Sequence, residues 1–168
     1  MSDIFELLQR DPNAWVEQAD ALFLSAKLAQ NKFMQVREIP APHLDTRLQQ
    51  LAFFDSFMML TAFAFENLIK GLGVTKGMHW KNDFSDEGGH GIASYAHKVI
   101  STSAEEKDLL GRLQVFSIWA GRYPMPTTSG KYHADADNRR FSFPKDVHLI
   151  EKLSARLKSE IQSAAGSK

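Results

Sequence analysis

The sequence predicts an all-α protein, an up-and-down bundle of four long helices with additional short helices, for three reasons. Residues 51–72, LAFFDSFMMLTAFAFENLIKGL, are apolar almost all round a helical wheel, which is typical of a helix buried by its neighbours. Helix-start and helix-stop residues flank other segments in which apolar residues recur every three or four positions. No segment reads as a strand of useful length. The 168 residues suit one domain, residues 1–168, with a single core and a frayed tail at 164–168.

Composition and charge narrow the possible classes of function. The chain is 43% hydrophobic and 24% charged, which is ordinary for a soluble globular protein. Its 20 basic and 20 acidic residues balance, which argues against non-specific nucleic-acid binding driven by bulk charge but leaves a local basic patch open. Without cysteine, the chain has no disulfide, no thiol nucleophile and no thiolate metal ligand.

The N-terminal sequence MSDIFELLQRD lacks the basic residues and the long apolar core of a signal peptide, so we expect a cytoplasmic protein. The long apolar stretch is not expected to cross a membrane. Asp55 interrupts it and Glu66 ends it, which leaves fewer than the roughly 20 apolar residues that a bilayer requires.

Cap and proline signals bound the first two long helices. The first is predicted to begin at Asn13, a typical N-cap residue, and to run to about Met34. A short helix is expected before it, at residues 4–8, as a lid. Residues 39–42, IPAP, break the chain because proline lacks an amide donor and disfavours helix in the residue before it. The second long helix is predicted to start near Leu44 and to run through the apolar stretch.

Gly71 and Gly73 are predicted to end this second helix as C-cap residues. The following loop, at about 74–89, is long and sets aromatic residues among charges, and loops of this length in compact domains are often functional. A short third helix is predicted next. Its apolar face consists of Ile92, Tyr95, Ala96, Val99 and Ile100.

Ser103 and Glu106 form a capping box, which predicts the start of a fourth helix that Gly121 should end. Its buried face is predicted to consist of Leu109, Leu110, Leu113, Phe116, Ser117 and Ala120. A second long loop is predicted at about 127–143. Pro144 then suits the first turn of a last helix, where its missing amide does no harm.

Two acidic residues and a lysine form a narrow polar stripe on the second helix. Glu66 precedes Lys70 by four residues, the favourable order for an ion pair on a helix. Asp55 shares their face, but at about 1.5 Å per residue it lies roughly 16 Å from Glu66, so the two carboxylates cannot act as a catalytic pair. The stripe is interpreted as a polar seam satisfied by neighbouring helices. The alternative is that Glu66 and Lys70 belong to a site where the helix leaves the core.

A second group of candidate residues follows the fourth helix. Arg122 has two interpretations: it interacts with the negative helix end, which Tyr123 helps to seal, or it joins an anion-binding rim. In the second interpretation Tyr123 or Trp80 offers a surface on which a base could stack. The other cations of the rim are Lys131, His133, Arg139 and Arg140. His90 is expected to cap the third helix or to line a pocket.

The sequence offers no motif for a metal or a cofactor, and none is expected. His90 and His97 lie roughly 10 Å apart along a helix, too far to share one metal ion. The glycines at 71–77 follow a helix instead of a strand and lack a terminal GK[ST], so a phosphate loop is excluded. DADN at 135–138 lacks the central glycine and the distal glutamate of a calcium loop.

Three segments occur in a recognisable order: FENLIKGL at 65–72, GGHGIASYAHKV at 88–99 and SAEEKDLLGRLQVFSIWAGRYP at 103–124. Together they resemble bacterial members of the HEPN superfamily (higher eukaryote and prokaryote nucleotide-binding domains). The resemblance covers residues 51–126, with a final helix in the expected place. It implies an up-and-down helical bundle, commonly dimeric. Such proteins include ribonuclease toxins, partners of nucleotidyltransferase antitoxins, and non-catalytic modules associated with nucleotides or RNA.

The ribonuclease members carry an arginine and a histidine with four to six residues between them, at a helix start in the second half of the domain. Here the only such spacing joins Arg37 to His43, within a proline-broken linker. We therefore expect a homodimeric, non-catalytic module, without enzyme activity, that binds a nucleotide, RNA or a partner protein of nucleotidyltransferase type. Two alternatives remain. One is a metal-independent ribonuclease in which Arg122 acts with a spatially adjacent histidine, such as His90 or His133. The other is a purely structural helical interaction protein.

Overall fold

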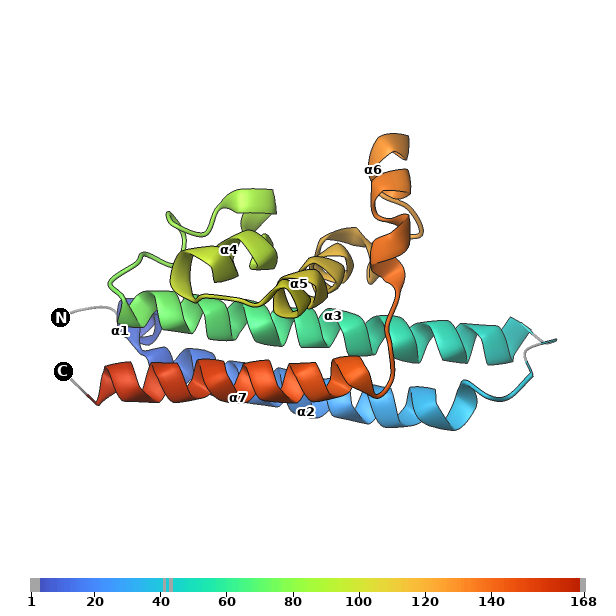
Figure 1. Cartoon of the computed structure of the whole chain (residues 1–168), viewed down its shortest axis with the longest axis horizontal. Helices are drawn as coiled ribbons and strands as arrows, with labels where there is room; N and C mark the ends of the chain where they lie inside the picture. Colours follow the sequence, from blue (N-terminus) through green and yellow to red (C-terminus); the bar gives the residue numbers. More distant parts are fainter. Residues whose placement is uncertain (1–3, 41, 43, 167–168) are drawn as a thin grey trace.

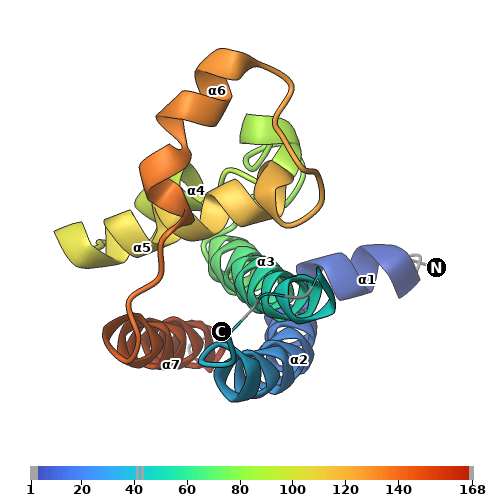
Figure 2. The ribbon, with the colours of Figure 1, turned by 90° about the vertical axis from the view of Figure 1, so that its right-hand side faces the viewer.

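The structure is a computed structural model that describes residues 4–40, 42 and 44–166. These residues form helices and turns without any strand, which confirms the all-α prediction. The long helices are α2 (Pro12–Val36), α3 (Leu44–Thr75), α5 (Ala104–Val115) and α7 (Lys145–Ala165), and the short ones are α1 (Ile4–Arg10), α4 (Ile92–Val99) and α6 (Ser129–Ala134). Helices α2, α3 and α7 lie side by side along the long axis (Figure 1). Helix α5 crosses them, so Figure 2 shows it lengthwise while the other three are seen end-on.

Helix α3 is the centre of the fold, because α2, α4, α5 and α7 all pack on it. From Phe57 onward it supplies much of the core, including Phe57, Phe65 and Leu68, each at most 3% exposed. By length and composition α3 could also cross a membrane, but 67% of that apolar window is buried in the protein. A buried core helix of a soluble protein passes the same test, so this is weak evidence for a membrane span.

The prediction that Gly71 and Gly73 end this helix is wrong, because α3 continues to Thr75. Both glycines are buried against neighbours that leave no room for a side chain. A Cβ atom on Gly73 would lie 2.4 Å from Cζ of Phe84, and one on Gly71 would lie 2.9 Å from Cβ of Trp15. Close packing against these neighbours therefore requires glycine at both positions, and a left-handed backbone is not the reason.

Of the two predicted helix caps, the one for α2 is wrong and the one for α5 is correct. Asp11, not Asn13, caps α2: its Oδ1 accepts a hydrogen bond from the Asn13 N–H at 2.9 Å, so Asn13 already lies in the first turn. The capping box of α5 is confirmed. The Ser103 hydroxyl accepts from the Glu106 N–H at 3.2 Å, and the Glu106 carboxylate accepts from the Ser103 N–H at 2.8 Å.

Both predicted loops contain short helical turns, which the sequence analysis missed. The loop at 74–89 ends in a 3-10 turn at Asp86–Gly89. The loop at 127–143 contains α6 and a second 3-10 turn at Ala136–Arg139, and α6 projects away from the other helices (Figure 1). Helix α5 likewise continues into a π-helical turn at Phe116–Ala120 before Gly121 ends it, as predicted. The sequence predicts a frayed tail at residues 164–168, of which the structure describes 164–166. Residues 164 and 165 still belong to α7.

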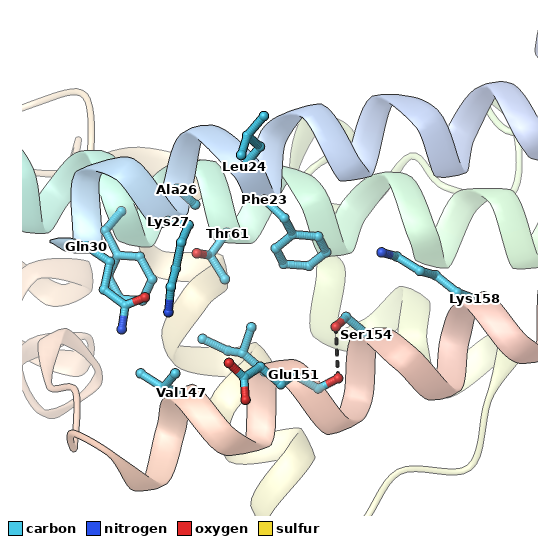
Figure 3. Close-up of a pocket in the computed structure, with 12 residues that line it drawn as sticks. Phe23, Leu24, Ala26, Lys27, Gln30, Thr61, Val147, Glu151, Ser154 and Lys158 are labelled. Carbon is cyan, nitrogen blue, oxygen red and sulfur yellow. Dashed lines mark hydrogen bonds between the residues drawn. The ribbon is translucent and has the colours of Figure 1, made fainter.

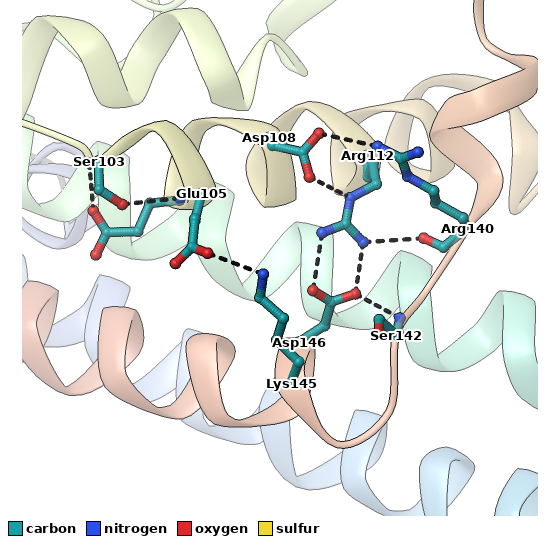
Figure 4. Close-up of polar contacts among 9 residues, drawn as sticks. Ser103, Glu105, Asp108, Arg112, Arg140, Ser142, Lys145 and Asp146 are labelled. Carbon is teal, nitrogen blue, oxygen red and sulfur yellow. Dashed lines mark hydrogen bonds and ion pairs between the residues drawn. The ribbon is translucent and has the colours of Figure 1, made fainter.

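A buried ion pair joins α5 to the first turn of α7 (Figure 4). Arg112 donates from both terminal nitrogens to the two carboxylate oxygens of Asp146, at 2.7 and 3.0 Å. Its remaining donors reach Asp108 at 2.9 Å and the carbonyl of Arg140 at 3.1 Å, and the Ser142 N–H donates to Asp146 at 2.6 Å. Burial opposes ionisation of Asp146, but the hydrogen bonds from Arg112 and Ser142 outweigh it, so the pKa of Asp146 is lowered.

We predict that Gly73→Ala destabilises the protein, because the new methyl group overlaps the buried Phe84 ring and overpacking typically costs about 1–3 kcal/mol. Gly111→Ala is the matched control. A Cβ on Gly111 meets nothing within 4 Å, and alanine is favoured over glycine in a helix by up to about 1 kcal/mol. Urea unfolding of both variants measures the difference. Wild-type stability for Gly73→Ala would contradict the packing role of this glycine.

We predict that Asp146→Asn loses about 3–5 kcal/mol of unfolding free energy at neutral pH, because the buried Arg112 loses its buried counter-charge and keeps only the partly exposed Asp108. The folded pKa of Asp146 lies below its unfolded value of about 3.9, so the stabilisation is complete above that pH and is lost as the pH falls through the folded pKa. The difference in unfolding free energy between the wild type and Asp146→Asn should therefore become smaller in acid.

Chemical unfolding across this pH range measures that difference. The double replacement of Arg112 by Met and Asp146 by Leu should recover much of the loss, because it removes both charges together. A difference that stays constant in acid would refute the assigned role of the ionised Asp146.

Candidate functional site

Three residues that the sequence analysis selected, Glu66, Lys70 and His90, meet at the C-terminal part of α3. Lys70 Nζ lies 2.6 Å from Oε1 of Glu66, as their four-residue spacing predicts. Nδ1 of His90 lies 2.9 Å from the other carboxylate oxygen of Glu66. Lys70 Nζ also donates to the carbonyl of Gly89 at 3.1 Å. One buried carboxylate thus binds both a lysine and a histidine.

The two α3 residues are buried, whereas the side chain of His90 is 32% exposed. When the imidazole is neutral, a hydrogen bond to a carboxylate requires the proton on Nδ1, which leaves Nε2 as an acceptor. Glu66 therefore holds the ring in one orientation and one tautomer. This arrangement suits either hydrogen bonding to a ligand or the transfer of a proton.

A pocket of about 620 Å³ lies beside this cluster. The loop after α3 forms its other walls, and the lining residues are Glu66, Lys70, Trp80, Lys81, Asn82, Phe84, Ser85, Gly88, Gly89 and His90. Phe84 holds this loop against α3, because its ring fills the space above Gly73 and meets the Tyr95 ring edge-on, with the ring centres 5.0 Å apart. The pocket therefore depends on the packing of one loop phenylalanine.

Trp80 borders this pocket and also a smaller one of about 440 Å³. Its ring centre lies 6.2 Å from that of Trp15 and 6.4 Å from that of His79, whose ring is nearly parallel to it. The indole N–H is buried and has no hydrogen-bond partner within the described part of the chain. An unsatisfied buried donor is unfavourable, so the indole N–H of Trp80 is a donor that still needs an acceptor.

Arg122 lies apart from this cluster. Its guanidinium donates to the carbonyl of Ile118 at 2.6 Å, the contact expected if it caps the end of its own helix. The next residue back, Gly121, packs against Met59. Met59 precedes Glu66 by seven residues, or about 10 Å along α3. His90 is bonded to Glu66, so the described contacts do not pair Arg122 with it.

The loop cations are also engaged in separate contacts. The Arg139 guanidinium lies 4.7 Å from the centre of the Tyr132 ring, and the ring of His133 meets the same tyrosine edge-on. Arg140 lies 3.6 Å from Asp108. Tyr123 and Lys131 line a further pocket of about 390 Å³. Arg122 lies over the ring of its neighbour Tyr123, 5.6 Å from the ring centre. The contacts described here do not join the loop cations to Arg122 as one anion-binding rim.

Asp55, the third member of the predicted stripe, forms no ion pair with the described residues. Burial raises its pKa to about 6. Because this value lies above the unfolded one, the charged carboxylate lowers stability above that pH, and the penalty disappears as the pH falls. Within the described residues, no group of three His, Asp or Glu side chains is placed to hold a metal ion. His43 of the Arg37–His43 spacing lies outside the described residues.

Sequence reasoning missed Lys81, Asn82 and Ser85 as lining residues, although the length of their loop and its aromatic residues did suggest function. It also missed the ion pair of Arg112 and Asp146, which are 34 residues apart and carry no local signal.

Comparisons of the chain with known protein families, with curated proteins and with solved structures gave no match. The fold and the site therefore define the class: an all-α protein with a charged pocket beside its central helix.

Proposed function

We propose that this protein is a non-catalytic, HEPN-like helical module that binds a nucleotide in the pocket beside Glu66 and His90. One observation carries the proposal: a single pocket combines the aromatic Trp80 and the exposed cation Lys81 with the oriented ring of His90. A nucleotide needs an aromatic or apolar surface for its base and cationic donors for its phosphates. The pocket volume of about 620 Å³ lies within the usual range for small-molecule sites.

The charges inside the pocket support an anionic ligand. Glu66 accepts from Lys70 and contacts His90, so its negative charge is already compensated. Lys81 stands at the pocket wall without an ion pair to any described residue. Lys81 is therefore the cation available to phosphate oxygens, and Nε2 of His90 can donate to them only when it carries a proton.

The remaining parts of the proposal rest on the sequence resemblance. They are RNA or a partner protein of nucleotidyltransferase type as further binding partners, and a homodimeric state. The cytoplasmic location does not come from the resemblance and stays a prediction from the sequence. A purely structural helical interaction protein is the alternative that lacks any small-molecule site.

Nucleotide binding is predicted to stabilise the full chain, because a ligand that binds only the folded state shifts unfolding by mass action. His90→Ala and Lys81→Ala should each weaken binding about 10- to 100-fold, the loss expected for one hydrogen bond to a charged group. Thermal unfolding with and without nucleoside monophosphates and triphosphates measures the stabilisation, and calorimetric titration measures the affinities.

Arg122→Ala is the control, since its guanidinium is bonded to its own helix end, and it should leave nucleotide affinity unchanged. If no nucleotide binds, the nucleotide proposal is wrong, and the structural alternative is then favoured.

Metal-independent cleavage of RNA is a second candidate function, favoured by the hydrogen bond between Glu66 and His90. A carboxylate that orients an imidazole and leaves Nε2 available is the arrangement of a general base. In this ribonuclease hypothesis Glu66 is the partner of His90, whereas the sequence alone suggested that Arg122 acts with the histidine.

This alternative predicts that the purified protein cleaves RNA in the presence of a metal chelator. His90→Ala should abolish cleavage, whereas Arg122→Ala should retain it. Activity that depends on Arg122 and survives the loss of His90 would refute this assignment.

A further inference from the structure

A separate cavity, of about 290 Å³, opens between α2 and α7 (Figure 3). Both helices pack on α3 but touch each other little, so α3 forms the floor of the gap. Apolar side chains from all three helices make its walls: Phe23, Ala26, Phe57 and Ile150. The volume lies at the lower limit of small-molecule sites, which restricts the occupant to a compact molecule.

Two polar side chains that line this cavity form no hydrogen bond with the described residues. Thr61 on α3 is 1% exposed, and its hydroxyl has no hydrogen bond to any described residue. Gln30, which is 8% exposed, lines the same cavity from α2 and also has no side-chain hydrogen bond within the described chain. A buried hydroxyl without a partner is unfavourable, so the floor favours a ligand with a polar tip.

The mouth of the cavity carries two opposite charges, one on each flanking helix. Lys27 extends from α2 and Glu151 from α7, and both side chains reach into the gap (Figure 3). Neither forms an ion pair with a described residue, whereas Lys158 at the same cavity pairs with Asp20. A cation and an anion that face one opening match a ligand with both charges at one end.

We propose that this cavity binds a compact zwitterion with an apolar body, the chemistry of a free aromatic amino acid. Its carboxylate meets Lys27, its ammonium group meets Glu151, and its ring lies between Phe23 and Phe57. A hydroxyl at the tip of the ring reaches Thr61. The site shares no residue with the pocket beside His90, so this inference is independent of the proposed nucleotide binding.

Four probes, each differing from tyrosine by at most one polar group, test the proposal by calorimetric titration of the full chain. Tyrosine should bind most tightly. Phenylalanine lacks the hydroxyl, tyramine lacks the carboxylate and desaminotyrosine lacks the ammonium group. Each deletion should weaken binding: about 10-fold or more for a charged group, and less for the hydroxyl.

Three variants assign each group of the ligand to its partner. Lys27→Met should weaken tyrosine binding about 10-fold and leave the binding of tyramine, which has no carboxylate, unchanged. Glu151→Gln should weaken tyrosine binding about 10-fold and leave the binding of desaminotyrosine, which has no ammonium group, unchanged. Thr61→Val, which keeps the shape of the side chain, should remove the preference for tyrosine over phenylalanine. Lys27 and Glu151 are exposed, so both variants should fold.

Melting curves of the three variants, recorded by circular dichroism, show whether each one is folded. The proposal is overturned if none of the four probes binds, or if a folded variant weakens all probes equally. Nucleotide affinity unchanged in Lys27→Met would support two separate sites, whereas its loss would contradict their independence.

Discussion

The burial of α3 by the helices around it is the constraint on which the rest of the structure depends. A polar group on a buried helix has to find its partner inside the protein, because water does not reach it. Glu66 and Lys70 meet this requirement by pairing with each other and by binding His90 and the carbonyl of Gly89. The contacts that make this end of α3 tolerable in the core are therefore the same contacts that build the candidate site. Thr61, on the same helix before Glu66, lacks such a partner, and a cavity lies against it.

Close approach to α3 also decides where its neighbours lie. Gly71 and Gly73 carry no Cβ, so Trp15 and Phe84 pack directly against the helix backbone. Phe84 in turn holds the following loop in place, and that loop supplies Trp80 and the remaining walls of the pocket. Gly73 thus shapes the candidate site indirectly, because it lets Phe84 pack against the backbone of α3.

The ion pair of Arg112 and Asp146 performs a similar task between α5 and α7. Removing a carboxylate and a guanidinium from water is unfavourable unless nearly every donor and acceptor is satisfied, and here the backbone of Arg140 and Ser142 completes the network (Figure 4). The pair therefore fixes both the start of α7 and the course of the chain that leads to it. The nearby exposed pair of Lys145 and Glu105 adds little, because water screens it.

The sequence by itself determined the long helices, the capping box at Ser103 and the pairing of Glu66 with Lys70, because these depend on hydrogen bonds and side chains a few residues apart. It could not show that Gly73 faces a phenylalanine instead of ending a helix, since both uses of glycine look the same along the chain. Only the tertiary structure brought His90 to Glu66 across 24 residues and opened a cavity beside Thr61. Such contacts depend on how helices distant in sequence pack together, and local backbone preferences do not encode that packing.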